Sequence, residues 1–315
     1  MRRIVELSTR IVALAVTGVV GLLAAVGLLA TILVTNLSVR NGTDIKPAHV
    51  LRADTSLADH YLDVIKRHLT RSDYTVSTEQ AIPLTVRQFL NVRGLKLSQV
   101  SMDSEEDGSS AWPESAETMI GMKRLDNLHY CIRDVLARNV PGDFIECGAW
   151  RGGATIFMRA ALLAYNDPDR SVWVADSFQG LPAPNPGVYP ADLGDEYFKH
   201  GDQLAIPADT VRLNFARYGL IDNRVKFLVG WFKDTLPLAP IERLSILRID
   251  ADMYEGTIQS LELLYSKVSP GGYIIVDDYG AVEGCRKAVD VFRLQQHITS
   301  PMTKIDWTGV YWRKS

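Results

Sequence analysis

Residues 141–153 read Pro-Gly-Asp-Phe-Ile-Glu-Cys-Gly-Ala-Trp-Arg-Gly-Gly. Phe144 and Ile145 form a short apolar run that indicates a buried strand, after which glycines punctuate a turn. Residues 154–163 are almost all apolar or small and predict a helix. A strand, a glycine turn and a helix in this order are typical of the unit that opens a doubly wound α/β nucleotide-binding domain. The alternative is an ordinary turn between a strand and a helix.

Gly148 and Gly152 in this turn are candidate cofactor-binding residues. Glycine lets the backbone approach a ligand closely, and the N-terminus of the following helix faces that ligand. The spacing over residues 146–153 is Glu-x-Gly-x-x-x-Gly-Gly, which resembles the first motif of S-adenosylmethionine-dependent methyltransferases. It is not the G-x-G-x-x-G spacing, which argues against a nicotinamide-dependent dehydrogenase.

The chain beyond this unit alternates between predicted strands and predicted helices. Strands are predicted at 172–175, 225–229, 244–249 and 273–276, helices at 211–218, 255–267 and 284–292, and a terminal hairpin at 304–312. Upstream helices are predicted at 57–69 and 118–138. The alternation predicts a doubly wound, mainly parallel sheet.

Residues 182–208 interrupt this alternation with five prolines, which block long helices. A long irregular stretch is either disordered or a functional lid. Its aromatic and charged residues favour a lid.

Composition narrows the class of protein. The chain has 315 residues, of which 47% are hydrophobic and 23% charged, so it is not a disordered chain. The net charge of −3 gives no electrostatic support for a nucleic-acid partner. Cys131, Cys147 and Cys285 form no C-x-x-C pair, so we expect three reduced structural thiols rather than a zinc site or disulfides.

Residues 11–34 form an uncharged apolar run behind a basic segment, 1–10. As a helix, the run would extend about 36 Å at 1.5 Å per residue, enough to cross a bilayer core of about 30 Å. A signal peptide is the alternative, but the run exceeds the usual apolar region and no clear A-x-A site follows. We therefore predict a transmembrane helix at 11–34, a linker at 35–56 and one domain at 57–315, with a helical part at 57–140.

Acidic residues follow three of the predicted strands directly. Asp176 follows the second strand and suits hydrogen bonds to ribose hydroxyls; its alternative role is a helix N-cap. Asp250, Asp277 and Asp278 follow two later strands and converge at one sheet edge if those strands are neighbours. Carboxylates so close repel each other unless a cation neutralises them, and oxygen ligands suit Mg²⁺. The alternative is a set of unrelated caps and turn formers.

A metal at this edge would lower the pKa of a bound sugar hydroxyl, and a nearby carboxylate would then take the proton. Asp252, two residues beyond Asp250, is the candidate base. His200 in the predicted lid is a weaker candidate.

Six stretches together resemble the macrocin O-methyltransferase family, the Mg²⁺-dependent sugar O-methyltransferases of macrolide and aminocoumarin biosynthesis. The similarity covers roughly residues 57–315. The matching stretches are Thr-Met-Ile-Gly-Met-Lys-Arg-Leu-Asp-Asn-Leu (118–128), Gly-Asp-Phe-Ile-Glu-Cys-Gly-Ala-Trp-Arg-Gly-Gly (142–153), Trp-Val-Ala-Asp-Ser-Phe-Gln-Gly-Leu-Pro (173–182), Gly-Trp-Phe-Lys-Asp-Thr-Leu-Pro (230–237), Leu-Arg-Ile-Asp-Ala-Asp-Met-Tyr-Glu (247–255) and Gly-Gly-Tyr-Ile-Ile-Val-Asp-Asp-Tyr (271–279).

The resemblance implies a class I S-adenosylmethionine-dependent methyltransferase fold with a seven-stranded sheet. Asp250, Asp277 and Asp278 match the family's metal ligands, and Asp252 matches its proposed general base. The positions that match the surroundings of S-adenosylmethionine are Thr118, Met119, Glu146, Asp176, Ser177 and, near the adenine, Trp231.

The resemblance favours an enzyme that transfers a methyl group from S-adenosylmethionine to a sugar hydroxyl with the help of Mg²⁺. The rivals are a nicotinamide-dependent dehydrogenase and a non-catalytic, membrane-anchored sugar- or nucleotide-binding protein. The acceptor is expected to be a sugar-containing natural product, with a lipid-linked or surface glycan as an equal alternative because of the segment 11–34. Because S-adenosylmethionine is made in the cytosol, we expect a single-pass membrane protein whose catalytic domain faces the cytoplasm. Whether the chain forms a homo-oligomer stays open.

Overall fold

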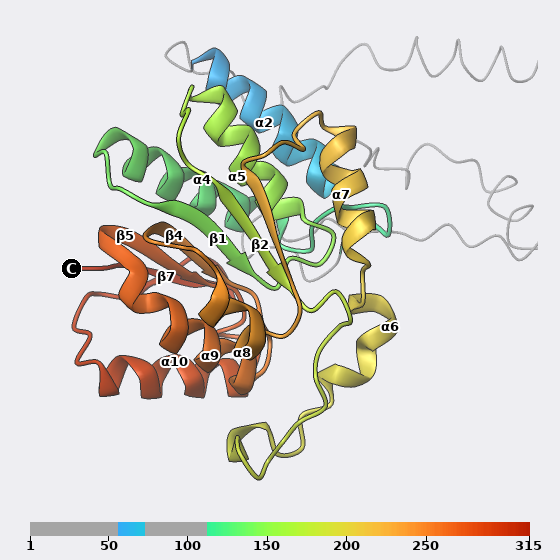
Figure 1. The fold of residues 1–315 in the computed structure, drawn as a ribbon, viewed down its shortest axis with the longest axis vertical. Helices are drawn as coiled ribbons and strands as arrows, with labels where there is room; N and C mark the ends of the chain where they lie inside the picture. Colours follow the sequence, from blue (N-terminus) through green and yellow to red (C-terminus); the bar gives the residue numbers. More distant parts are fainter. Residues whose placement is uncertain (1–55, 73–111) are drawn as a thin grey trace, which may run out of the picture. The chain divides into compact units, whose positions relative to one another are not determined.

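The computed structural model describes residues 56–72 and 112–315, which form an α/β domain (Figure 1). Its sheet contains seven strands within these residues, in the order β3-β2-β1-β4-β5-β7-β6. The strands are β1 (Asp143–Cys147), β2 (Val172–Asp176), β3 (Val225–Val229), β4 (Leu244–Ile249), β5 (Val268–Val276), β6 (Thr303–Lys304) and β7 (Val310–Arg313). Strands β1 to β5 are parallel, whereas β7 runs antiparallel to both β5 and β6. The predicted doubly wound, mainly parallel sheet is confirmed.

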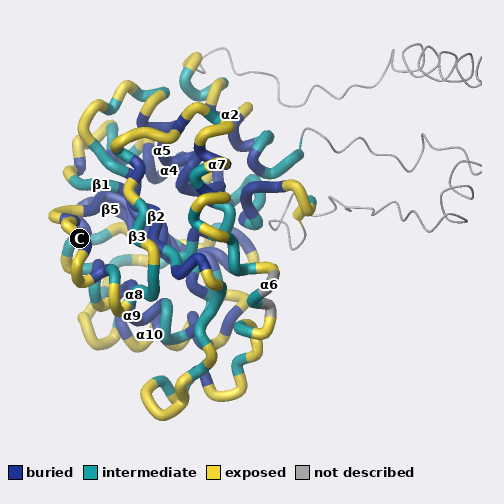
Figure 2. The backbone as a smooth tube through the Cα atoms, turned by 45° about the vertical axis from the view of Figure 1, so that its right-hand side comes forward, coloured by how far each residue is buried: buried dark blue, intermediate teal, exposed yellow. Residues whose placement is uncertain are grey.

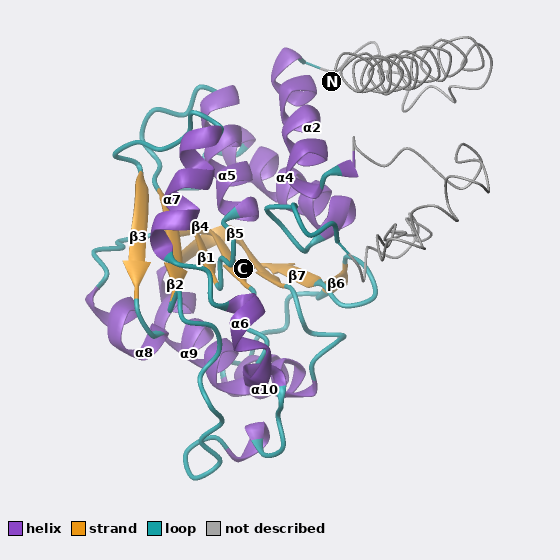
Figure 3. Ribbon diagram, turned by 90° about the vertical axis from the view of Figure 1, so that its right-hand side faces the viewer, coloured by secondary structure: helices purple, strands orange, loops and turns teal. Residues whose placement is uncertain are grey.

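Helices cover both faces of this sheet. The helices are α2 (Leu57–Thr70), α4 (Gly121–Ala137), α5 (Gly153–Ala164), α6 (Gly201–Leu204), α7 (Ala208–Arg217), α8 (Phe232–Thr235), α9 (Tyr254–Leu264) and α10 (Glu283–Gln295). Figure 3 shows α2, α4, α5 and α7 on one face and α8, α9 and α10 on the other. Short 3₁₀ turns lie at Pro190–Asp192, Tyr197–His200, Leu236–Leu238 and Tyr265–Lys267.

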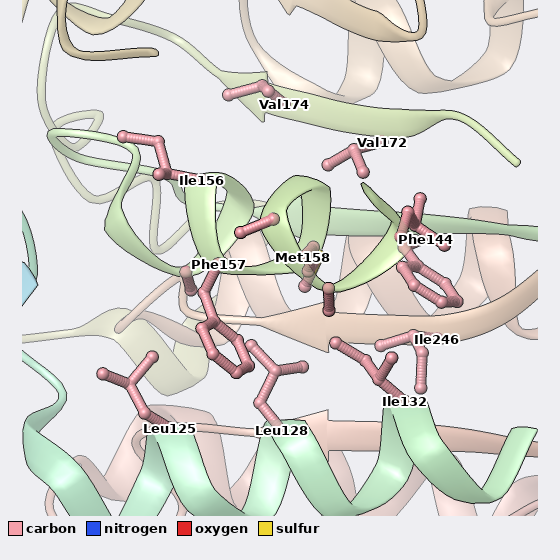
Figure 4. Close-up of a cluster of buried hydrophobic side chains, with 14 of the residues drawn as sticks. Leu125, Leu128, Ile132, Phe144, Ile156, Phe157, Met158, Val172, Val174 and Ile246 are labelled. Carbon is pink, nitrogen blue, oxygen red and sulfur yellow. The ribbon is translucent and has the colours of Figure 1, made fainter. Parts of the chain in front are cut away.

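Each face of the sheet has its own hydrophobic core. Figure 4 shows part of the first core, in which side chains of α4 and α5 pack on the sheet; examples are Leu128, Phe157 and Phe144. The second core lies beneath α9 and α10 and includes Leu261 and Phe292. Because apolar side chains cover both faces, β4 is buried along its length and β5 at every residue except Pro270, as parallel strands usually are.

The segment between β2 and α7 contains only short helices, in keeping with its prolines. Its residues are mostly exposed or half-buried (Figure 2). A role for residues 182–208 as a lid stays a prediction.

The predicted membrane localisation needs correction. No helix within 56–72 or 112–315 is both long and apolar enough to cross a membrane. The longest described helix, α4, has 17 residues, or about 25 Å, and carries the charged side chains of Lys123, Arg124 and Asp126. The predicted segments 1–10 and 11–34 lie outside the described residues. A single-pass membrane protein with a cytoplasm-facing domain is therefore no longer our interpretation.

Candidate active site

A cavity of about 1100 Å³ opens at the carboxyl ends of the central strands. Its wall includes Gly148 after β1, Ser177 after β2, Asp250 after β4, and Asp277 and Asp278 after β5. Ligands of open α/β sheets bind at this edge, where the loops that follow the strands meet. The cavity therefore unites the glycine turn with the acidic residues that follow the strands.

Gly148 is required by packing as well as by its conformation. Its φ is +89°, and a Cβ at this position would come within 1.7 Å of the carbonyl oxygen of Asp250. Gly152, also at positive φ, precedes α5, and a Cβ there would meet the side chain of Val211 at 2.7 Å. Gly148 lines the cavity, whereas Gly152 does not line it and packs against Val211.

Asp176 links the end of β2 to the glycine turn. One carboxylate oxygen accepts the backbone N–H groups of Ala149 at 2.7 Å and Trp150 at 3.2 Å, and the other accepts that of Phe178 at 2.6 Å. Burial raises the pKa of Asp176, and these N–H groups oppose that rise. A carboxylate has about four acceptor sites, so one remains for a ligand in the cavity. Asp176 thus stabilises the glycine turn through these hydrogen bonds. It is not the N-cap of α5, which is Gly152.

Asp250, Asp277 and Asp278 come together at the other side of the cavity. One carboxylate oxygen from each lies within 4.8 Å of the others. Three oxygen donors at this spacing fit a hard divalent cation such as Mg²⁺. The arrangement brings the three predicted ligands together, while their role as ligands stays a prediction.

Asp252 lies beside this cluster in a left-handed conformation with φ +53°, which aspartate tolerates better than most residues. Its backbone N–H donates to the Asp278 carboxylate at 3.3 Å. Burial, followed by the charges of Asp250 and Asp277, raises the pKa of Asp252 to about 7. Burial and the neighbouring Asp252 likewise raise the pKa of Asp278 well above its usual range. The cluster therefore carries more negative charge than its surroundings readily hold.

Two buried arginines, which we did not predict, partly balance that charge. Arg248 in β4 is 1% exposed and donates to Glu146, to Asp250 at 2.7 Å and to Asp277. Arg124 in α4 also donates to Asp277. A charged residue inside the apolar run 244–249 was the available signal for Arg248, whereas nothing in the sequence distinguishes Arg124 from other helix arginines.

Glu146 lies beneath the cavity rather than in its wall. It is 2% exposed; one oxygen accepts from Arg248, and the other has no hydrogen-bond partner among the described residues. Burial raises the pKa of Glu146 to about 8. Of the predicted cofactor-binding residues, the cavity wall includes Met119, Gly148, Asp176, Ser177 and Trp231, but not Thr118, Glu146 or Gly152.

The β2–α7 segment contributes Tyr197 to the cavity wall. The side chain of His200, our weaker candidate base, lies outside what the structure describes. At the start of this segment, the hydroxyl of Ser177 donates to the carbonyl of Gly180 at 2.7 Å and so stabilises a turn.

Comparison with known proteins now assigns the chain to a family. A family model described as macrocin-O-methyltransferase (TylF) matches residues 58–314. The chain belongs to the macrocin O-methyltransferase family. It is an S-adenosylmethionine-dependent O-methyltransferase, so the dehydrogenase and non-catalytic alternatives are set aside.

Three curated proteins are similar to this chain in sequence. The 8-demethyl-8-(2,3-dimethoxy-α-L-rhamnosyl)-tetracenomycin-C 4′-O-methyltransferase of Streptomyces olivaceus is 45% identical over 81% of this chain and 92% of its own. The demethyldecarbamoylnovobiocin O-methyltransferase of Streptomyces niveus is 50% identical over 65% of this chain and 78% of its own. The mycinamicin III 3″-O-methyltransferase of Micromonospora griseorubida is 44% identical over 81% of this chain and 96% of its own.

A solved structure of the O-methyltransferase NovP matches the fold with a TM-score of 0.69 at 42% identity. The match covers 82% of this chain and 99% of that one. Together with the strand order, this match confirms the predicted class I methyltransferase fold with a seven-stranded mixed sheet.

Proposed function

We propose that this enzyme methylates a hydroxyl group on the sugar of a glycosylated natural product, with Mg²⁺ bound beside the acceptor. The single observation that carries this proposal is the convergence of Asp250, Asp277 and Asp278 in the same cavity as the glycine turn. The relative from Streptomyces olivaceus supports a sugar acceptor, because its name specifies the 4′-position of a rhamnosyl-tetracenomycin, and the relative from Micromonospora griseorubida is likewise named for a primed position, 3″. The lipid-linked glycan loses its support because it rested on the membrane segment.

S-adenosylmethionine is assigned to the side of the cavity formed by the turns after β1 and β2. Asp176 has a remaining acceptor site for a ribose hydroxyl, and Gly148 gives the ligand access to the backbone. Met119, Ser177 and Trp231 complete this wall. The cofactor supplies the methyl group, and these residues bind and orient it.

The acceptor hydroxyl is assigned to the side formed by the ends of β4 and β5. Mg²⁺ held by Asp250, Asp277 and Asp278 would lower the pKa of that hydroxyl. Asp252 would accept its proton, and a pKa near neutrality suits a general base. Asp252 is a better base than Asp250 or Asp277, because Arg248 contacts both of those carboxylates and Arg124 contacts Asp277. A carboxylate beside a positive charge holds a proton less readily.

The test is a methylation assay with the purified full chain, S-adenosylmethionine and MgCl₂. The acceptors are the substrates named for the three curated relatives, and mass spectrometry detects the addition of one methyl group. We expect at least one glycosylated acceptor to be methylated on its sugar, with loss of activity in EDTA. Methylation of the aglycone alone would contradict a sugar acceptor, and full activity in EDTA would contradict the role of Mg²⁺.

A further inference from the structure

Arg124 joins two carboxylates that lie far apart in the sequence. Its Nε donates to Asp306 at 2.8 Å, and its Nη1 donates to the Oδ2 atom of Asp277. The side chains of Arg124, Asp277 and Asp306 are 8%, 5% and 0% exposed, so water competes little for these contacts. Buried charge-assisted hydrogen bonds of this kind fix geometry as well as charge.

Asp306 is itself held in place by the turn between β6 and β7. Its second oxygen accepts the backbone N–H groups of Thr308 at 3.0 Å and Gly309 at 2.7 Å. The hydroxyl of Thr308 then donates to the backbone carbonyl of Asp277 at 2.9 Å. The turn therefore contacts Asp277 by two routes, through its backbone and, by way of Arg124, through its carboxylate.

The remaining oxygen of Asp277 is held from the opposite direction. Its Oδ1 atom accepts from Arg248, whose own position in β4 is fixed by the sheet. The two arginines thus use one acceptor site on each oxygen and leave the others free for a cation. Asp278, in comparison, accepts a backbone N–H from Asp252 at 3.3 Å.

We propose that Arg124 is a positioning residue for the metal ligand Asp277, and that Asp306 holds Arg124 in the orientation this requires. The proposal rests on the proposed Mg²⁺ site and extends it to residues outside the ligand set. Arginine is needed because its planar fork reaches both carboxylates at once, whereas a lysine ammonium is a single point charge. Loss of an outer partner of a metal ligand typically weakens metal affinity about 10- to 100-fold.

The alternative role for Arg124 is that of a counter-charge only. If Arg124 served only as a counter-charge, any cation in its place would act equally well, and removing it would strengthen Mg²⁺ binding. Arg124→Lys distinguishes the two because it preserves the charge and loses the two-carboxylate geometry. Arg159→Lys is the matched control, since Arg159 is 3% exposed and paired with Asp222, and neither residue lines the cavity.

The experiment is a calorimetric titration of the full chain with MgCl₂ alone, beside a thermal melt of each variant. We expect Arg124→Lys to weaken the Mg²⁺ Kd about tenfold or more, and Arg159→Lys to leave it unchanged at a similar loss of thermal stability. Asp306→Asn should also weaken Mg²⁺ binding. If Arg124→Lys does not fold, Asp306→Asn is the variant that tests the proposal.

Two results would overturn the proposal in distinguishable ways. Wild-type Mg²⁺ affinity, or tighter binding, in Arg124→Lys would make Arg124 a counter-charge only. Absence of Mg²⁺ binding by the wild-type chain would refute the proposed metal site itself, and the positioning role with it.

Discussion

Gly148 and Asp250 touch through their backbones, so the glycine turn and the first residue of the acidic cluster form one packed unit. A Cβ on Gly148 would lie 1.7 Å from the carbonyl oxygen of Asp250, far closer than any real contact. Gly148→Ala should therefore separate the two turns and weaken both S-adenosylhomocysteine and Mg²⁺ binding, each about tenfold or more. Isothermal titration calorimetry with each ligand measures this.

Gly219→Ala is the matched control for that substitution. Gly219 also has positive φ, +66°, but a Cβ there would meet nothing within 4 Å. Gly219→Ala introduces backbone strain without a steric clash. We expect it to leave the affinities for S-adenosylhomocysteine and Mg²⁺ unchanged. Equal losses in the two variants would mean that strain, and not contact with Asp250, explains the effect.

Asp176 should matter to the cofactor in two ways, because it braces the glycine turn and offers an acceptor to the ribose. Asp176→Ala leaves the N–H groups of Ala149, Trp150 and Phe178 without their acceptor. We expect S-adenosylhomocysteine binding to weaken by about 1–3 kcal/mol or more. Unchanged affinity would show that the assigned cofactor pocket is wrong.

Trp307 is expected to help bind the acceptor. It is 41% exposed, lines the cavity and lies in the turn that Asp306 fixes. An exposed aromatic face on a rigid turn suits an apolar sugar face or aglycone. Trp307→Ala should raise the acceptor KM roughly tenfold, a loss of about 1.4 kcal/mol, and leave S-adenosylhomocysteine affinity unchanged. Steady-state kinetics checks this, and Trp307→Phe should restore part of the loss; an unchanged KM in Trp307→Ala would remove Trp307 from the acceptor site.

His129 should make the domain less stable in mild acid. Burial, aided by the nearby Lys66, lowers the pKa of His129 to about 4, and its Nε2 lies 2.6 Å from the hydroxyl of Tyr165. The unfolded chain, with a pKa of about 6.5, binds the proton more readily, so stability falls as the pH drops from about 6.5 to 4. The full contribution is about 3 kcal/mol, at about 1.4 kcal/mol per pKa unit.

Denaturant unfolding of wild type and His129→Gln across this pH range measures the effect. The difference in unfolding free energy between the two proteins should shrink or change sign as the pH falls, because only wild type must protonate His129 on unfolding. A difference independent of pH would mean that His129 titrates normally in the folded domain.

The sequence predicted those parts of the site that follow strands directly. Asp250, Asp277 and Asp278 each come after an apolar run, and parallel neighbouring strands must bring such residues together. Glu146 differs from these residues because it is the fourth residue of β1 and contacts Arg248 beneath the cavity wall, so its role in binding the cofactor stays a prediction.

Contacts between distant segments could not be predicted in this way. Arg124 and Asp306 are 182 positions apart, and their pairing depends on how α4 and the β6–β7 turn both pack beside β5. The start of β5 was missed for a local reason. It begins at Val268 rather than at 273, because the register shift before Tyr273 lets the glycine pair 271–272 lie within the strand.

We propose that four aspartates divide two roles: Asp250, Asp277 and Asp278 bind Mg²⁺, and Asp252 takes the proton from the sugar hydroxyl. Mg²⁺ affinity and turnover, measured side by side in Asp252→Asn and Asp277→Asn, separate these roles. We predict that Asp252→Asn retains the affinity for Mg²⁺ and S-adenosylhomocysteine while kcat falls by roughly 10²-fold or more, and that Asp277→Asn loses metal binding and activity together. Loss of Mg²⁺ in Asp252→Asn as severe as that in Asp277→Asn would make Asp252 a metal ligand and exclude it as the separate base.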